Sequence, residues 1–329
     1  MEKTRNHAFD VLKGIACIGV VFIHVKFLGL TGDIVSKISQ FAVPIFFMIA
    51  GYYAFNSDIF VIKRRLIKII KILLYSLLLY SSFYFITHII KCNFEEWILN
   101  LFTLKNLLKS IVFCTIGFAI PLWYLIAMAE TYILWYFVVK NKNEINLVKL
   151  LPLIFFIRFF LTSYVESKGL PWCLKINFIT CSLTWFLLGY YVKLKENIIY
   201  NIKNKMLFIT LISGVIIALI PILFNTNINF SNIGLFFYSL SLFLFAIKYK
   251  NIQINNIITY IGNKLSLNIY ILHSLIAVLL HYANVLQFHI NNSFVLHIKP
   301  IIVLIITILT AYIIEIIVNL KDKIYQNKF

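Results

Sequence analysis

The chain has 329 residues, of which 61% are hydrophobic and 13% charged, and its formal net charge is +18. Soluble globular domains carry about 25% charged residues, so this composition, with a mean hydropathy of +0.91, excludes the soluble globular class. The apolar residues form long runs, which is typical of helices that cross a bilayer. We therefore predict an all-α polytopic membrane protein.

About ten apolar runs approach the length of roughly 20 residues that a helix needs to cross a bilayer. We expect them to form one bundle, so that residues 1–329 make a single transmembrane domain. The predicted spans are residues 9–29, 39–56, 66–90, 119–139, 147–164, 177–194, 206–224, 230–248, 265–284 and 299–320.

The basic residues stand at the ends of the apolar runs and are not gathered on one element. This distribution argues against nucleic-acid binding and follows the positive-inside rule. Most of the 30 Lys and Arg residues fall in inner segments if both termini are cytoplasmic. We therefore expect a multi-pass protein of the cell membrane with both ends inside, where its basic residues attract anionic membrane lipids.

The five cysteines predict neither a disulfide framework nor a metal site, because their number is odd and no CxxC pair occurs. Several lie inside apolar runs, where cysteine behaves as a small buried hydrophobe.

The connection at residues 91–118 differs from the other loops because charged residues punctuate leucines and aromatic residues there. This pattern is typical of an amphipathic helix lying in the outer membrane interface. A plain connector is the alternative.

The first span contains the most informative set of ionisable residues, namely Asp10, Lys13 and His24. Eleven residues are almost three helical turns, so Lys13 and His24 share one face and lie about 16 Å apart. Asp10 lies one turn before Lys13. Imidazole is well suited to proton transfer near neutral pH, although Lys13 could be a snorkelling lysine and His24 a packing contact.

Three further ionisable residues lie within predicted spans, where such groups are costly and mark candidate functional sites. His273 lies in the ninth span, where a structural hydrogen bond is the alternative to a catalytic role. Glu130 and Arg158 lie in successive spans and could form a buried ion pair.

A basic run follows the second span and contains Lys63, Arg64, Arg65, Lys68 and Lys71. Arginine forms bidentate contacts with phosphate oxygens, so the run could bind a phosphate-bearing ligand. Anchoring of the inner membrane surface is the alternative.

Several segments, taken in order, resemble motifs of the acyltransferase-3 family of membrane acyltransferases. The start FDVLKGIA and the spacing from Lys13 to His24 are similar to the opening of that family's first helix. Further segments that resemble family motifs are residues 43–52 (VPIFFMIAGY), 63–69 (KRRLIKI), 121–125 (PLWYL) and 260–273 (YIGNKLSLNIYILH).

The resemblance implies a donor, usually acetyl-CoA or another acyl-CoA, and an acceptor hydroxyl on a cell-surface glycan or lipid-linked sugar. Together with the ionisable residues, it assigns catalytic roles to Asp10, His24, Glu130 and His273. It assigns donor binding to Lys13, Arg64, Arg65 and Lys68, and it implies no metal.

In the expected reaction, His24 takes the proton of the acceptor hydroxyl while the hydroxyl oxygen attacks the thioester carbonyl. An acyl-histidine intermediate is an alternative route. A rival hypothesis is a polytopic transporter or exopolysaccharide export component without acyl-transfer chemistry.

Overall fold

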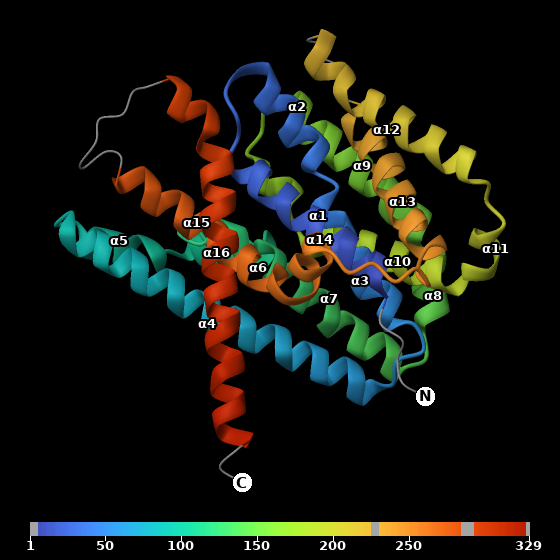
Figure 1. Ribbon diagram of the computed structural model, residues 1–329, viewed down its shortest axis with the longest axis horizontal. Coiled ribbons are helices and arrows are strands. Elements are labelled where there is room, and N and C mark those ends of the chain that lie inside the picture. Colours follow the sequence, from blue (N-terminus) through green and yellow to red (C-terminus); the bar gives the residue numbers. More distant parts are fainter. Residues whose placement is uncertain (1–5, 225–229, 284–292, 327–329) are drawn as a thin grey trace. The chain divides into compact units, whose positions relative to one another are not determined.

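A computed structural model describes residues 6–224, 230–283 and 293–326, which form helices and contain no strand (Figure 1). This confirms the prediction of an all-α protein. The chain divides into two compact units, one made of residues 1–46, 200–226 and 233–329 and the other of residues 47–199 and 227–232. Each unit is described by itself.

The first unit contains the N-terminal and C-terminal helices. Its elements are α1 (His7–His24), α2 (Gly29–Ser39), α12 (Asn204–Phe224), α13 (Ser231–Lys248), α14 (Ile257–Tyr260), η4 (Ile261–Leu265), α15 (Ser266–Ala283) and α16 (Ser293–Gln326). Here α1 packs against α2, α14, η4 and α15, and α15 lies beside the long α16 (Figure 1).

The second unit contains the middle of the chain and most of α3. Its elements are α3 (Ala42–Ala54), α4 (Ile59–Ile90), α5 (Phe94–Leu101), α6 (Leu104–Val112), η1 (Ile120–Leu122), α7 (Trp123–Lys140), α8 (Glu144–Lys149), α9 (Leu151–Ser167), η2 (Trp172–Lys175), η3 (Phe178–Leu183), α10 (Thr184–Leu194) and α11 (Glu196–Tyr200). In this unit α4 packs along α7, while η3 lies against α7 and α9.

Eight helical segments of the described chain are long and apolar enough to cross a membrane. They correspond to eight of the expected spans, which supports a polytopic membrane protein. The expected spans at 147–164 and 177–194 correspond to shorter helices, the 17-residue α9 and the continuous apolar helix Phe178–Leu194.

Several helix ends differ from the expected boundaries, and two of the differences have a local cause. The first helix ends at His24 and not near residue 29, because Val25 adopts an extended conformation. The third expected span begins at Ile59 and not at residue 66, since the Asp58 side chain caps α4 by accepting a hydrogen bond from the Val61 amide at 3.0 Å. Lysine and arginine favour helix, so the basic run lies inside α4.

The segment predicted to be amphipathic forms two short helices, α5 and α6. Large apolar side chains on both remain exposed, including Leu99, Leu104 and Ile111. Exposed apolar side chains beside charged ones suit a helix in a membrane interface.

Small residues let two helices of the second unit cross closely. A Cβ atom on Gly51 of α3 would lie 1.8 Å from the Phe186 carbonyl oxygen, and one on Gly189 of α10 would lie 2.0 Å from the Met48 carbonyl oxygen. Close contact between small residues is a common way to pack membrane helices.

Candidate functional site

Two histidines from opposite ends of the sequence meet in the first unit. His24 is the last residue of α1, and His273 lies near the middle of α15. The centroids of their rings are 5.0 Å apart, and the ring planes are tilted by 46°. The structure therefore brings together two of the residues that the sequence nominated for catalysis.

The backbone of α15 fixes the proton on one nitrogen of His273. Its Nδ1 lies 2.8 Å from the Tyr270 carbonyl oxygen. A carbonyl only accepts hydrogen bonds, so Nδ1 must carry the proton, and Nε2 of the neutral ring is left with a lone pair. Nε2 is buried and has no hydrogen-bond partner among the described residues.

The two histidines differ in accessibility. The His273 side chain is fully buried, whereas His24 is exposed. His24 is therefore the member of the pair with accessible surface, while His273 has none. The buried member of such a pair is suited to orienting the accessible one.

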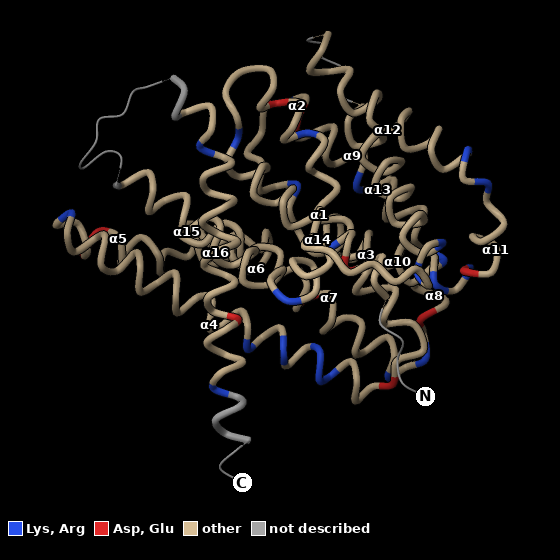
Figure 2. Tube along the Cα trace, in the orientation of Figure 1, with Lys and Arg blue, Asp and Glu red and all other residues tan. Residues whose placement is uncertain are grey.

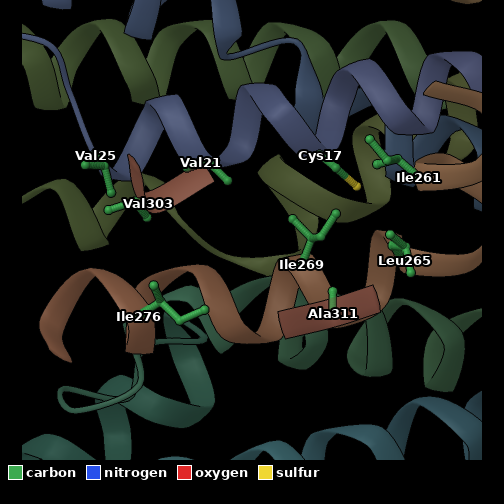
Figure 3. Packing of buried hydrophobic residues seen from close by; sticks show 9 residues of the cluster. All are labelled: Cys17, Val21, Val25, Ile261, Leu265, Ile269, Ile276, Val303 and Ala311. Carbon is green, nitrogen blue, oxygen red and sulfur yellow. The ribbon is translucent and has the colours of Figure 1, made fainter. Parts of the chain in front are cut away.

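An apolar seam follows the contact of α1 with η4, α15 and α16 (Figure 3). Side chains at one-turn intervals on α1 point toward side chains of η4, α15 and α16. The seam consists of Cys17, Val21, Val25, Ile261, Leu265, Ile269, Ile276, Val303 and Ala311. The fully buried His273 lies on the same helix as Ile269 and Ile276 of this seam, so its side of the pair is in a medium of low dielectric constant.

A close helix crossing holds the opposite end of α1. A Cβ atom on Gly262 of η4 would lie 1.8 Å from the Asp10 carbonyl oxygen, and one on Gly14 would lie 2.2 Å from the Ile258 carbonyl oxygen. Only glycine permits this approach at both positions. The crossing fixes α1 against η4 and thereby sets how α1 meets α15.

Asp10 and Lys13 form an ion pair beside this crossing, with a distance of 2.7 Å from Nζ to Oδ1. Asp10 is buried, and Lys13 is partly exposed. The sequence placed both residues on one face, and the structure adds that the aspartate compensates the lysine charge. Along the helix, Lys13 lies about 16 Å and Asp10 about 21 Å from His24, so neither is in direct contact with its ring.

The proposed donor-binding residues Arg64, Arg65 and Lys68 lie in the N-terminal half of α4, in the second unit (Figure 2). Arg65 donates to the Tyr53 carbonyl oxygen at 2.8 Å, so part of its guanidinium is already engaged. Arg64 and Lys68 are exposed, and neither pairs with a carboxylate of the described residues. Their charges remain available to a ligand.

The possible Glu130–Arg158 ion pair is not formed. Glu130 of α7 instead accepts a hydrogen bond from the Cys114 thiol at 3.2 Å, and Arg158 of α9 donates to the Thr180 carbonyl oxygen. Burial and the nearby Glu130 carboxylate raise the pKa of Cys114 above its ordinary value. Helical periodicity gave no means of deciding which residue of η3 would face α9.

Sequence reasoning missed two features around these residues. The first is the Tyr270 carbonyl, which sets the His273 tautomer. It is a backbone group, so no side-chain pattern in the sequence points to it. The π-helical turns η3 and η4 were also missed. Such turns are rare in proteins, and those that occur are often found at functional sites. The described residues contain no group of three or more His, Cys, Asp or Glu side chains that could hold a metal ion.

The comparisons with known proteins identify one family. A family model described as an acyltransferase domain matches residues 6–319 of the chain. No curated protein and no solved structure shows a significant match. The matched range includes every candidate residue described above.

Proposed function

Because the chain belongs to the acyltransferase-3 family of acyltransferases, we propose that it transfers an acetyl group from acetyl-CoA to a hydroxyl of a cell-surface or lipid-linked glycan. The observation that carries this proposal is the His24–His273 pair, in which an exposed imidazole lies 5.0 Å, ring to ring, from a buried one. Such a pair can accept and return one proton during acyl transfer.

His24 is the general base of the proposed reaction. The acceptor oxygen bonds to the thioester carbonyl carbon while its proton moves to the His24 ring. When the tetrahedral intermediate collapses, the carbon–sulfur bond breaks, and His24 returns the proton to the departing CoA thiolate. The products are the acetyl ester and CoA thiol.

His273 acts as a positioning residue for His24. Its Nδ1 is committed to the Tyr270 carbonyl, so Nε2 is the nitrogen that can accept a hydrogen bond. In the proposed reaction the His24 ring turns so that its N–H donates to this lone pair. The other nitrogen of His24 would then carry the lone pair that removes the acceptor proton.

The donor enters from the cytoplasmic side, and the acceptor enters from the opposite side of the cell membrane. With both termini cytoplasmic, Lys13 and the basic residues of α4 lie at the inner surface, where Arg64, Arg65 and Lys68 bind the CoA phosphates. CoA is too polar to cross the bilayer, so its phosphates stay at the inner surface and only its thioester arm enters the membrane. Asp10 contributes by holding Lys13.

The test uses membranes that contain the full-length protein, supplied with radiolabelled acetyl-CoA. Label in glycan and lipid fractions and release of CoA thiol are measured together. We expect His24→Ala to lower both by about 10²–10⁴-fold, the usual contribution of a general base. The control is His281→Ala, which removes an exposed histidine of α15 outside the seam.

Wild-type activity of His24→Ala at an equal protein level would contradict the general-base role. Substrate uptake without thiol release would instead support the rival transporter hypothesis. Replacing acetyl-CoA by succinyl-CoA in the same assay identifies the acyl group.

A further inference from the structure

Arg158 is a buried cation that the proposed acyl transfer does not use. It lies near the middle of α9, and 7% of its surface is exposed. Its Nη1 donates to the Thr180 carbonyl oxygen and lies 3.7 Å from the Cys181 sulfur. The guanidinium carbon lies 5.3 Å from the centroid of the Trp185 ring.

No carboxylate of the described residues compensates this charge. In the same unit Glu166 pairs with Lys175, Glu196 pairs with Lys193, and Glu130 accepts from Cys114. Arg158 is therefore held only by neutral groups. A buried charge without a counter-charge is costly, and such a residue in an apolar helix is a candidate binding site.

The contacts of Arg158 orient its guanidinium but engage only one of its three nitrogens. A carbonyl and a sulfur engage Nη1, and the Trp185 ring supports the planar group. Nε and Nη2 have no partner among the described residues. An arginine fork of this kind matches the two oxygens of a carboxylate or the oxygens of a phosphate, which it binds through parallel hydrogen bonds.

We propose that Arg158 binds an oxyanion, a carboxylate or phosphate group carried by the acceptor glycan or by a lipid. Thr180 is the third residue of η3, next to the connection between α9 and η3 that the expected topology places outside. The anion therefore approaches from the side of the acceptor. This direction of approach rests on the proposed function. The observation that Arg158 has no counter-charge among the described residues is independent of that function.

The first measurement is the melting temperature of the purified full-length protein in a neutral detergent, with increasing glucuronate or inorganic phosphate. We expect at least one anion to raise it in wild type and in Lys168→Met, which removes an exposed cation at the end of the same helix. For the same rise in melting temperature, Arg158→Met should require an anion concentration at least about thirtyfold higher than wild type. An equal rise in Arg158→Met, or no rise with either anion, overturns the proposal.

The second measurement separates an anion site from a structural arginine. Without anion, Arg158→Met should melt at the same temperature as wild type or higher, because an uncompensated buried charge is removed. A lower melting temperature or a failure to fold would overturn the proposal. Arg158→Lys keeps the charge without the fork and should bind the anion more weakly than wild type while remaining folded.

The third measurement identifies the source of the oxyanion. The protein is placed in bilayer discs of phosphatidylcholine, with or without phosphatidylglycerol. If phosphatidylglycerol stabilises wild type but not Arg158→Met and removes the response to glucuronate or phosphate, the site binds lipid headgroups. If that response persists, the site binds an acceptor group.

Thiol release is measured in the same preparations. Release that depends on His24, combined with no anion effect at Arg158, overturns this inference alone. Anion binding at Arg158 without His24-dependent release overturns the proposed function alone.

Discussion

His24 and His273 face each other with their ring centroids 5.0 Å apart, and only His24 is accessible. The Tyr270 carbonyl holds the proton of His273 on Nδ1. His24 is therefore the member that can meet a substrate, and His273 is the member that can orient it.

The first prediction concerns His273. His273→Phe preserves a buried aromatic ring at this position of α15 but removes the Nε2 lone pair. We therefore expect kcat to fall by about 10²-fold while the KM for acetyl-CoA stays unchanged. Its pH–rate profile should also shift, because His24 loses its orienting partner. His281→Phe is the control. A raised KM with an unchanged kcat would mean that His273 contributes to donor binding.

The second prediction concerns the helix crossing. Gly262→Ala places a Cβ atom 1.8 Å from the Asp10 carbonyl oxygen, so α1 and η4 must separate. We expect a loss of stability of roughly 1–3 kcal/mol, the usual cost of overpacking, measured by thermal unfolding in detergent. Gly117→Ala is the matched control, since no atom lies within 4 Å of its added Cβ. Equal stability of the two variants would contradict a rigid crossing.

The third prediction concerns donor binding. Arg64 is exposed on α4, and we expect Arg64→Ala to raise the KM for acetyl-CoA by about tenfold through loss of a charge-assisted phosphate contact. The kcat should change little. Lys203→Ala removes an exposed cation from another segment expected inside and should leave KM unchanged. A normal KM with a lower protein level would support membrane anchoring instead.

The fourth prediction concerns topology. In a variant without the native cysteines, Asn201→Cys should be protected from an impermeant thiol reagent in intact cells, and Lys168→Cys should react. Both positions are exposed, so membrane sidedness and not burial decides the labelling. The reverse pattern would overturn the expected orientation and with it the entry of the donor and the acceptor from opposite sides.

The sequence determined the features that depend on local composition. Long apolar runs identified the membrane-spanning segments, because hydrocarbon requires both apolar side chains and hydrogen bonds satisfied within the helix. The spacing of Asp10 and Lys13 predicted one face, and the structure joins the two residues in an ion pair. Hydropathy identified the apolar part of each span better than the ends of its helix, so the predicted third span began at residue 66 and left out the basic start of α4.

Only the tertiary structure decided which distant residues meet. Helical periodicity relates side chains within one helix, and it says nothing about which face of α15 lies against α1. That choice depends on the crossing of Gly14 and Gly262 and on the apolar seam, which bring His273 to His24. In the same way, Glu130 pairs with Cys114, and Arg158 has no counter-charge among the described residues. Packing against η3, and not sequence order, determines the partners of these buried groups.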